Sequence, residues 1–451
     1  MDTTAGVEAS VLDFRGNPGA AMHALATELF PICRSITGEG LRQSLRILQR
    51  ELPGLQTFEV PSGTACFDWT VPPEWNIRDA YILDPAGRKI VDFKTSNLHV
   101  VSYSTPVDAT LDLDALRPHL YSLPEQPDAI PYVTSYYKER WGFCVTDLQK
   151  RSLLPGTYRV KIDSTLAPGS LTYGELVIPG SEAREVFLST DICHPSLGNN
   201  ELSGPVVTTA LARWLLSLPQ RRYTYRLVFI PETIGAIVYL SRHLEQLRRQ
   251  VIAGFTVTCI GDDRGYSYLP SRLGSTLSDR AALHALKHHA GTFRRYTYLD
   301  RGSDERQYCS PGVDLPIASI MRSKYADYPE YHTSKDNLGF VTPAGLGGGF
   351  EALRKAVMAI EANATFRATT PGEPNLGKRG LYPTLSTKDT ARQVRSMMNV
   401  LAYADGEHDL LSVAEMLDVP VWDLAPIAAT LEQHGLLERL RYENGGPADA
   451  R

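Results

Sequence analysis

The chain has 451 residues, enough for about two to four domains that each bury an apolar core. Its composition, 43% hydrophobic and 22% charged, is that of an ordinary globular protein and excludes collagen, coiled coil and extended disorder. The formal net charge of −5 offers no basic field for phosphate backbones or anionic lipid, so we expect nucleic acid to be an unlikely ligand.

The amino terminus and the cysteines indicate the cellular compartment. Residues 1–16 lack the basic and apolar regions of a signal peptide, and no run of about 18 apolar residues occurs to span a bilayer. We therefore expect a cytoplasmic protein with no membrane partner. The cysteines form no CxxC pair, which favours reduced, buried thiols over disulfides or a zinc ribbon; they are Cys33, Cys66, Cys144, Cys193, Cys259 and Cys309.

In the first third of the chain the residue pattern changes once, from helical to β. Residues 18–52 show apolar positions at helical spacing, interrupted by Pro31 and a turn at 37–40. From about residue 60 to 170, short β-branched and aromatic runs alternate with Pro, Gly and Asp, which predicts a β-rich unit. The helices are expected to pack on a larger core that follows.

From about residue 171 onward, strands and helices alternate. Buried strand runs are predicted at 186–190, 227–230, 255–260 and 315–321. Helices are predicted from Ser203, over 234–250 and over 342–363. This alternation predicts a mostly parallel sheet covered on both faces.

The C-terminal residues predict a separate module. A Pro- and Gly-containing linker at 371–374 is followed by helical patterns at 394–402, 411–417 and 421–437, which is typical of a winged helix. Residues 376–451 contain eight Lys and Arg against eleven Asp and Glu, so the module is acidic. Because duplex binding needs phosphate-neutralising cations, we expect oligomerisation or cleft closure rather than DNA binding.

Chemically active residues follow the predicted strands. His194 and Glu201 come after the first strand, Glu232 after the second, Asp262 after the third, and His332 lies in a later loop. The carboxyl ends of parallel strands meet at one edge, where open α/β sheets bind ligands. Imidazole and carboxylate ligands with a nearby free carboxylate predict a zinc hydrolase, and Glu232 is the candidate base.

These residues belong to longer motifs that resemble a known family. The series of His194, residues 198–204, Pro231-Glu232, Gly302-Ser303-Asp304 and residues 331–336 resembles the ordered motifs of the M28-type zinc aminopeptidases. Further motifs resemble an aminopeptidase-like family of bacterial polysaccharide and secondary-metabolite loci. They are Cys193-His194-Pro195-Ser196, residues 231–235, residues 259–263, residues 302–308 and residues 376–380. This resemblance implies a zinc-peptidase core with an inserted β-domain and a C-terminal winged helix.

The chain departs from the aminopeptidase pattern at three ligand positions. The aspartate that bridges two zinc ions falls on Asn200, the acidic residue after the base falls on Thr233, and the strand-end aspartate aligns with Thr258. An amide is a poor substitute for a bridging carboxylate. We therefore favour one zinc ion over two. The expected ligands are His194, His332 and one or both of Glu201 and Asp262.

Other residues are expected to contact the substrate. Asn200, Asp304, Arg306 and Tyr308 are the candidates, and Arg306 suits a carboxylate or phosphate. The alternative for residues 304–308 is a surface loop with an internal ion pair. Asp336 could orient a ligand or cap a turn, and we expect the cap.

Together these patterns predict an α/β fold, a zinc-exopeptidase-like doubly wound mixed sheet with a small inserted β-domain and a C-terminal winged-helix module. The expected boundaries are 1–58 for N-terminal helices of the core, 59–170 for the inserted domain, 171–368 for the α/β core and 369–451 for the winged helix. The predicted function is a zinc-dependent amide hydrolase acting on a small peptide, aminoacyl or N-acyl biosynthetic intermediate. The alternative is a catalytically retired peptidase fold that binds a ligand or acts as a scaffold. A homo-oligomer is expected, since the accessory domains offer surfaces for pairing.

Overall fold

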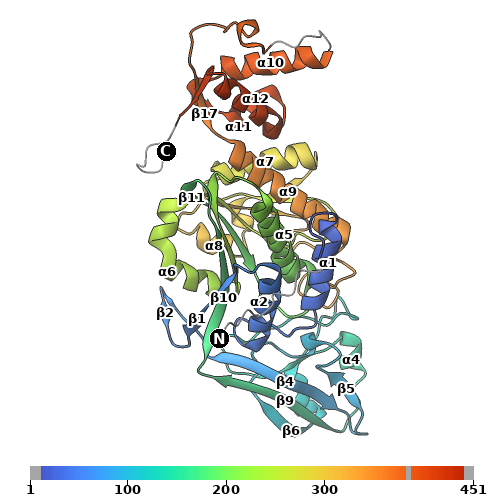
Figure 1. The fold of residues 1–451 in the computed structure, drawn as a ribbon. Helices are drawn as coiled ribbons and strands as arrows, with labels where there is room; N and C mark the ends of the chain where they lie inside the picture. Colours follow the sequence, from blue (N-terminus) through green and yellow to red (C-terminus); the bar gives the residue numbers. More distant parts are fainter. Residues whose placement is uncertain (1–11, 382–387, 441–451) are drawn as a thin grey trace, which may run out of the picture. The chain divides into compact units, whose positions relative to one another are not determined.

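The computed structural model describes residues 12–381 and 388–440 and divides the chain into two compact units (Figure 1). The first unit is built from residues up to 274 and residues 294–351, and the second from residues 275–293 and from 352 onward. Among the helices of the described ranges, none is long and apolar enough to cross a membrane.

The first unit is organised around an eight-stranded mixed sheet. Its strand order is β1-β10-β12-β11-β13-β16-β14-β15, and the four central strands from β12 to β16 run parallel. The predicted sheet is therefore confirmed. Its strands are β1 Gln56–Pro61, β10 Ser170–Ile178, β11 Glu182–Asp191, β12 Tyr223–Ile230, β13 Val251–Thr256, β14 Ser267–Leu269, β15 Arg294–Arg295 and β16 Ile317–Met321.

Helices cover both faces of this sheet, which explains the apolar runs of its central strands. In Figure 1, α1 and α5 lie on one side of β11 and α6 lies on the other. The helices of this unit include α1 Pro18–Leu29, α2 Glu39–Glu51, α5 Ser203–Ser217, α6 Ile234–Gln250 and α8 Glu305–Tyr308, and α9 Pro343–Ala362 starts in it.

One predicted strand ends earlier than expected. The pattern predicted a strand over 255–260, but β13 ends at Thr256. Cys259 has a φ of 50°, a left-handed conformation that does not continue a strand. The Val257 N–H still donates to the Ser189 carbonyl of β11 at 2.8 Å, and the chain then turns at Cys259 into the loop that carries Asp262.

The β-rich region is inserted between two neighbouring strands of the main sheet. β1 and β10 pair antiparallel, with Val60 opposite Leu171, and the chain between them forms its own four-stranded sheet. That sheet has the order β5-β4-β9-β6 and encloses a separate apolar core. Its strands are β4 Glu74–Leu83, β5 Lys89–Asp92, β6 Val107–Asp112 and β9 Thr157–Ala167. Smaller elements are β2 Ala65–Cys66, β3 Trp69–Thr70, α3 Leu113–Leu116, β7 Leu120–Tyr121, β8 Phe143–Cys144 and α4 Asp147–Arg151.

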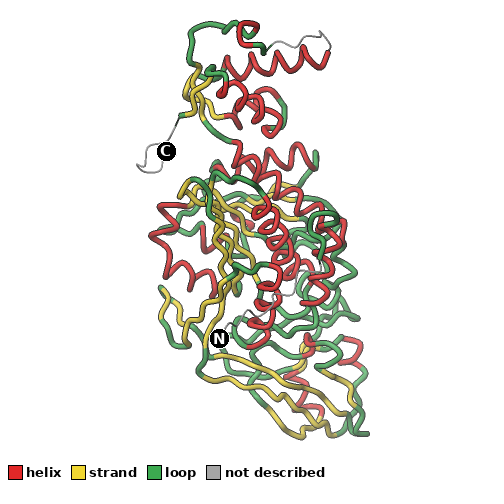
Figure 2. Tube along the Cα trace, viewed as in Figure 1, coloured by secondary structure: helices red, strands yellow, loops and turns green. Residues whose placement is uncertain are grey.

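The second unit combines helices with a three-stranded antiparallel sheet of order β18-β17-β19, the arrangement of a winged helix (Figure 2). Its elements are α7 Leu277–His289, β17 Thr365–Ala368, α10 Lys388–Ala402, β18 Asp405–Asp409, α11 Leu410–Leu417, α12 Val421–Gln433 and β19 Leu437–Arg439. The helix α7 groups with this unit although it lies about 90 residues earlier in sequence, an association the sequence pattern did not predict.

Asp409 holds this unit together from the start of α11. Its carboxylate accepts from the Ser412 amide at 2.9 Å, from Arg280 of α7 at 2.6 and 2.7 Å, and from Asn363 at 2.8 Å. Burial alone would raise the pKa of Asp409, but these hydrogen bonds hold it below its ordinary value. The stabilisation is therefore present above about pH 4 and is lost as the pH falls toward the folded pKa.

We expect Asp409→Asn to lower the free energy of unfolding of this unit by about 1–2 kcal/mol at pH 7, because it weakens a helix cap and an ion pair. The difference from wild type should shrink below about pH 4. Chemical denaturation at pH 7 and pH 3 measures both effects, with the exposed Glu407→Gln as a control. A difference that stays the same at both pH values would contradict this role of the charge.

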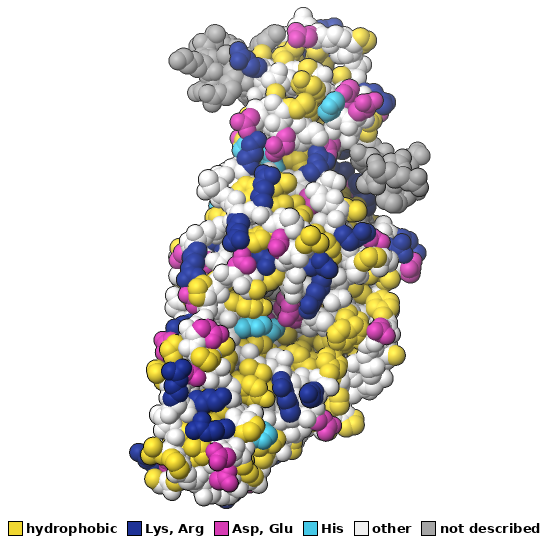
Figure 3. All heavy atoms as spheres, turned by 180° about the vertical axis from the view of Figure 1, so that it is seen from behind, with side chains coloured by type: hydrophobic (Ala, Val, Ile, Leu, Met, Phe, Trp, Pro, Cys, Tyr) yellow, Lys and Arg dark blue, Asp and Glu magenta, His cyan; other side chains and the backbone are white. Residues whose placement is uncertain are grey.

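On the face shown in Figure 3, basic and acidic side chains lie interspersed among hydrophobic ones rather than gathered in one large patch.

Candidate functional site

The predicted site residues lie around the carboxyl ends of β11 and β12. β11 ends at Asp191, and His194 follows in a loop that leads into one turn of wider π-helix, Gly198–Leu202 (η3). This turn carries Asn200 and Glu201 and runs directly into α5. Glu232 follows the end of β12, so both motif segments reach the same edge of the sheet.

Glu201 fixes the orientation of His194. One carboxylate oxygen, Oε2, lies 2.7 Å from His194 Nδ1, and the other accepts from the backbone N–H groups of His194, at 2.7 Å, and Cys193. Burial would lower the pKa of His194, but the Glu201 charge and hydrogen bond raise it to about 9. With Nδ1 donating to Glu201, His194 Nε2 is the nitrogen available to a ligand.

His332 lies beside His194 in a strained loop. The two rings have centroids 5.3 Å apart, and His332 Nε2 is buried with no hydrogen-bond partner in the described part of the chain. Burial and the neighbouring His194 lower the pKa of His332 to about 3, which keeps its imidazole neutral. The φ of 55° at His332 is a left-handed conformation that a non-glycine residue rarely adopts, and it orients this imidazole toward His194.

The inserted domain supplies one wall of the site. The Tyr132 ring packs edge-on against His194 and His332, with centroids 4.7 and 5.2 Å away. Its backbone N–H donates to the His332 carbonyl at 2.8 Å, next to a β-bridge between Pro131 and Thr333. The Tyr132 and Tyr136 hydroxyls lie 2.6 Å apart. Sequence reasoning missed Tyr132, because its partners lie about 60 and 200 residues away and only a cluster of tyrosines at 132–137 marks the segment.

Glu232 lies near Nε2 of His194, the ring nitrogen that Glu201 does not contact. Its Oε2 is 3.8 Å from His194 Nε2, and its side chain keeps 25% exposure, so it can reach a substrate. Desolvation and the charge of Asp191 raise the pKa of Glu232 to about 8. A carboxyl group whose pKa lies near neutrality can both accept and return a proton.

Asp304 and Arg306 organise the segment that follows Glu232. Asp304 Oδ1 accepts from the Thr233 N–H at 2.7 Å, and Arg306 Nη2 donates to Thr233 Oγ1 at 2.5 Å. Thr233 has a φ of 65°, so these bonds hold a strained residue directly after Glu232. Desolvation and the charge of Glu232 raise the pKa of Asp304 to about 7. The crowding of these carboxyl groups favours a cation at the site.

Comparisons with known proteins agree with this fold. A family described as a domain of unknown function, DUF4910, matches residues 23–363, and a winged helix-turn-helix family matches residues 364–439. The chain belongs to the DUF4910 family. A Clostridium acetobutylicum protein, provisionally named a polysaccharide biosynthesis protein with an aminopeptidase-like domain, is 44% identical over 398 residues, which cover 88% of this chain and 91% of that protein.

Solved structures place this DUF4910 chain among the M28-type aminopeptidase folds. The crystal structure of a provisionally named peptidase from Clostridium acetobutylicum is 41% identical and superimposes with a TM-score of 0.88, covering 94% of this chain and 96% of that one. BSAP, a zinc aminopeptidase from Bacillus subtilis, superimposes with a TM-score of 0.56 at 12% identity, and the match covers 78% of this chain and 96% of BSAP. A peptidase M28 precursor from Shewanella amazonensis has a TM-score of 0.52 at 13% identity, and the match covers 78% of this chain and 93% of that one. The last two likenesses show the fold, and that fold is the one the motifs predicted.

Two predicted site residues of this DUF4910 chain have other partners. Asp262 accepts hydrogen bonds from Asn199 Nδ2, from Ser323 through both its N–H and its hydroxyl, and from the Arg264 N–H. These bonds join Asp262 to the loop beside the site. Tyr308 is fully buried in the core, where its hydroxyl lies 2.7 Å from Ser189 Oγ.

Asn200 lies in the π-helical turn, and Asp336 binds the backbone of that turn. Asp336 accepts from the N–H groups of Asn199 at 2.6 Å and Asn200 at 3.0 Å, which is the backbone-capping role that the sequence predicted. Asn200 Oδ1 is buried and accepts no hydrogen bond from the described residues. This oxygen is therefore free to contact a cation or a substrate donor.

Arg34 contacts the backbone of His194, and the sequence analysis missed it. It is fully buried, donates from Nε to the His194 carbonyl at 3.2 Å and from Nη1 to the Leu29 carbonyl at 2.6 Å. Burial lowers the pKa of Arg34, and the charge of Glu201 opposes that shift. The only sequence signal was an arginine in the turn between two predicted helices.

The donor set at this site fits a zinc ion. His194 Nε2 lies 3.8 Å from Glu232 Oε2, and His332 Nε2 has no hydrogen-bond partner among the described residues. Glu201 holds the other ring nitrogen of His194 in the manner common for zinc-ligating histidines. The unpartnered Asn200 Oδ1 lies in the same turn as Glu201. Imidazole nitrogens, which give up their protons when a metal binds, and nearby oxygen donors are ligands that suit zinc.

A second group of potential ligands, in the winged-helix unit, does not fit a metal. His284, His288 and Glu415 lie close enough to share an ion. However, His284 Nε2 accepts from the Val421 N–H at 2.9 Å, so its Nδ1 carries the proton that binds Glu415. A protonated Nδ1 cannot coordinate, and this histidine instead joins α7 to α11 and α12.

The Tyr132 wall leads to a testable prediction. We expect Tyr132→Ala to weaken zinc binding about tenfold, because both imidazoles lose the ring that restricts them, whereas Tyr132→Phe should bind zinc like the wild type. Competition with a chromophoric chelator measures the dissociation constants, and thermal unfolding reports any general loss of stability. Equal zinc affinity in all three proteins would contradict a positioning role for the ring.

Proposed function

We propose that the protein is a zinc-dependent amide hydrolase. The observation that carries this proposal is the juxtaposition of two imidazoles with available Nε2 atoms, His194 and His332, and a partly exposed carboxyl, Glu232, at a strand edge of an M28-type fold. This is the donor set and base that metal-assisted hydrolysis requires.

The geometry favours a revised division of roles among the expected ligands. In this proposal one zinc ion is held by His194 and His332, with Asn200 Oδ1 as a neutral third donor. Glu201 acts through His194 Nδ1 instead of through the metal, since both its oxygens already accept hydrogen bonds. Asp262 is tied to Asn199 and Ser323 and supports the loop.

The protein groups then have distinct tasks in hydrolysis. A bound zinc ion supplies Lewis acidity, which polarises a carbonyl and makes water more acidic. Glu232 accepts the proton of the attacking water and returns it to the leaving amine. Asp304 and Arg306 hold Thr233, and through it they fix the backbone direction of Glu232.

The substrate proposed for this site is a small peptide, aminoacyl or N-acyl biosynthetic intermediate. The Tyr132 ring packs against both histidines, and its hydroxyl lies 2.6 Å from that of Tyr136; in this proposal these rings favour a small substrate over a long peptide. Arg306 Nε has no hydrogen-bond partner among the residues that the structure describes, and in this proposal it donates to an anionic or carbonyl group of the substrate.

The experiment that tests this proposal uses the zinc-loaded full-length protein. Aminoacyl anilides, dipeptides and N-acyl amino sugars form the substrate panel, and release of amine is followed by mass spectrometry. Turnover of at least one class, lost on chelation and restored by zinc, is the expected result. No turnover of any class by the zinc-loaded protein would contradict the proposal.

The alternative function is a retired peptidase fold that binds a ligand or acts as a scaffold. The observation that favours it is the replacement of three family carboxylates by Asn200, Thr233 and Thr258. Tight binding of an amide substrate without cleavage by the zinc-loaded protein would support this alternative.

A further inference from the structure

Arg34 is a buried cation beside the histidine site, and the proposed hydrolysis gives it no task. It lies in the turn between α1 and α2, and its side chain is fully buried. Its Nε donates to the His194 carbonyl at 3.2 Å, and its Nη1 donates to the Leu29 carbonyl at 2.6 Å. Its Nη2 has no hydrogen-bond partner among the described residues. The guanidinium therefore binds backbone carbonyls where a buried cation would ordinarily bind a carboxylate.

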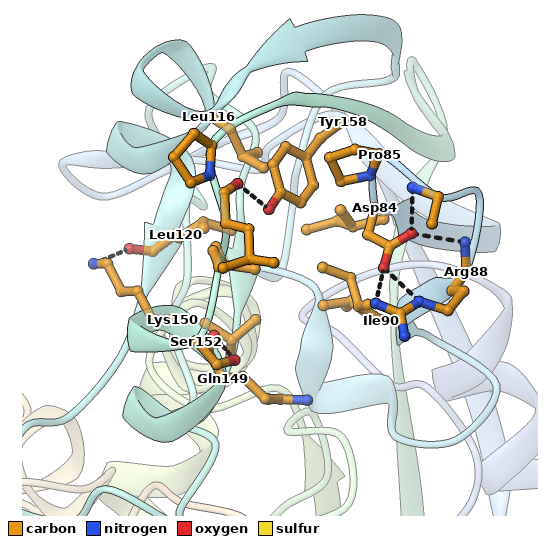
Figure 4. A pocket seen from close by; sticks show the side chains of 17 residues that line it. Asp84, Pro85, Arg88, Ile90, Leu116, Leu120, Gln149, Lys150, Ser152 and Tyr158 are labelled. Atoms are coloured by element: carbon orange, nitrogen blue, oxygen red, sulfur yellow. Dashed lines mark hydrogen bonds and ion pairs between the residues drawn. The ribbon is translucent and has the colours of Figure 1, made fainter.

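Two other arginines show the ordinary pairing. Arg226, which is also buried, donates from Nε and Nη2 to the carboxylate of Glu185 at 2.7 and 2.8 Å. Arg88, in the lining of a pocket of the inserted domain, donates to Asp84 at 2.8 Å (Figure 4). A buried charge without such a partner costs free energy. The burial of Arg34 therefore needs other compensation.

Two features of the surroundings supply part of that compensation. Leu29 is the last residue of α1, so the Arg34 cation lies at the negative end of a helix dipole. Burial lowers the pKa of Arg34, and the charge of Glu201 is the largest influence that opposes this shift. Glu201 is itself buried, so the two side chains are opposite charges enclosed in the same region.

These two charged side chains hold His194 from both ends of its backbone. Glu201 Oε1 accepts from the His194 N–H at 2.7 Å, while Arg34 donates to the His194 carbonyl. The other Glu201 oxygen lies 2.7 Å from Nδ1 of the same ring. A second bond ties this loop to the end of α1, because Ser196 Oγ donates to the Phe30 carbonyl at 2.8 Å. The direction of His194 Nε2 therefore depends on Arg34 as well as on Glu201.

We infer that Arg34 is a positioning residue for zinc: it holds the His194 carbonyl against the end of α1 and so keeps His194 Nε2 directed toward the ion. This inference rests on the proposed function, because it takes His194 as a zinc ligand. Arg34 contacts neither metal nor substrate in this role, since its side chain is fully buried. Replacing a group that orients a ligating histidine typically lowers metal affinity by about 10- to 100-fold.

Arg34→Lys and Arg34→Met in the full-length protein test the inference. Lysine keeps the charge but lacks the planar fork that serves two carbonyls at once, and methionine removes the charge and both bonds. Competition with a chromophoric chelator should show a zinc affinity about tenfold lower in Arg34→Lys and lower still in Arg34→Met. With Co²⁺ in place of zinc, the visible absorption spectrum of Arg34→Lys should change, because that spectrum depends on the geometry of the ligands.

The matched control is Arg226→Lys, which changes a buried arginine of the same unit outside the histidine site. It should bind zinc and cobalt like the wild type, whatever it does to the thermal unfolding of the metal-free protein. Thermal unfolding of all the variants without metal separates a loss of stability from a loss of affinity. Lowered zinc affinity in a folded Arg34 variant, with Arg226→Lys unchanged, supports the inference.

Three results would overturn the inference while the proposed function stands. They are wild-type zinc affinity in the folded Arg34 variants, an equal loss of affinity in Arg226→Lys and Arg34→Lys, and failure of both Arg34 variants to fold, which would make Arg34 a residue needed for folding alone. A wild-type protein that binds no zinc would instead overturn the proposed function, and this inference with it.

Discussion

Replacement of Glu232 by glutamine is expected to lower kcat by about 10²- to 10⁴-fold while zinc remains bound. The amide keeps the size of the carboxyl but cannot take a proton from water. Because Glu232 Oε2 lies 3.8 Å from His194 Nε2 and is not a proposed ligand, the metal affinity should change little. Steady-state kinetics on the substrate identified by the panel, with zinc content measured on the same sample, tests both parts.

The matched control for this variant is Glu245→Gln on α6, whose side chain is 79% exposed. It removes the same charge from the helix that follows Glu232, and it should retain the wild-type kcat. A Glu232→Gln protein that folds, keeps its zinc and turns over at the wild-type rate would contradict the assignment of Glu232 as the base.

Replacement of His332 by alanine is expected to weaken metal binding strongly. One of two imidazole ligands would be lost, so zinc affinity should fall by more than about 100-fold and hydrolysis should fall with it. The exposed His434→Ala variant is the matched control and should bind zinc like the wild type. Unchanged zinc affinity in His332→Ala would show that this histidine is not a ligand.

Regular elements with strong periodicity could be predicted from the sequence. The helix expected over 234–250 is α6, Ile234–Gln250, and the helix expected from Ser203 is α5. Their apolar stripes face a buried sheet, so local pattern and tertiary packing agree. The strand expected over 255–260 ended early because a left-handed residue, Cys259, overrides its β-branched neighbours, and no sequence pattern marks that conformation.

The candidate site could be predicted in its residues but not in its contacts. Strand-end position singled out His194 and Glu232, a motif in a later loop singled out His332, and the structure brings these three together. The role of Glu201 depends on which oxygen faces which nitrogen, and spacing alone does not contain that information. Tyr132 reaches the site from the inserted domain, so its contacts depend on how a whole domain docks.

Zinc content of the wild-type protein is the measurement that tests the central claim most directly. Elemental analysis of protein purified without chelators, with His194→Ala beside it, gives the number of ions per chain. The account predicts about one zinc per wild-type chain and its loss in His194→Ala. About two ions per chain would contradict the single-ion site, and a protein that neither contains nor takes up zinc would contradict the hydrolase itself.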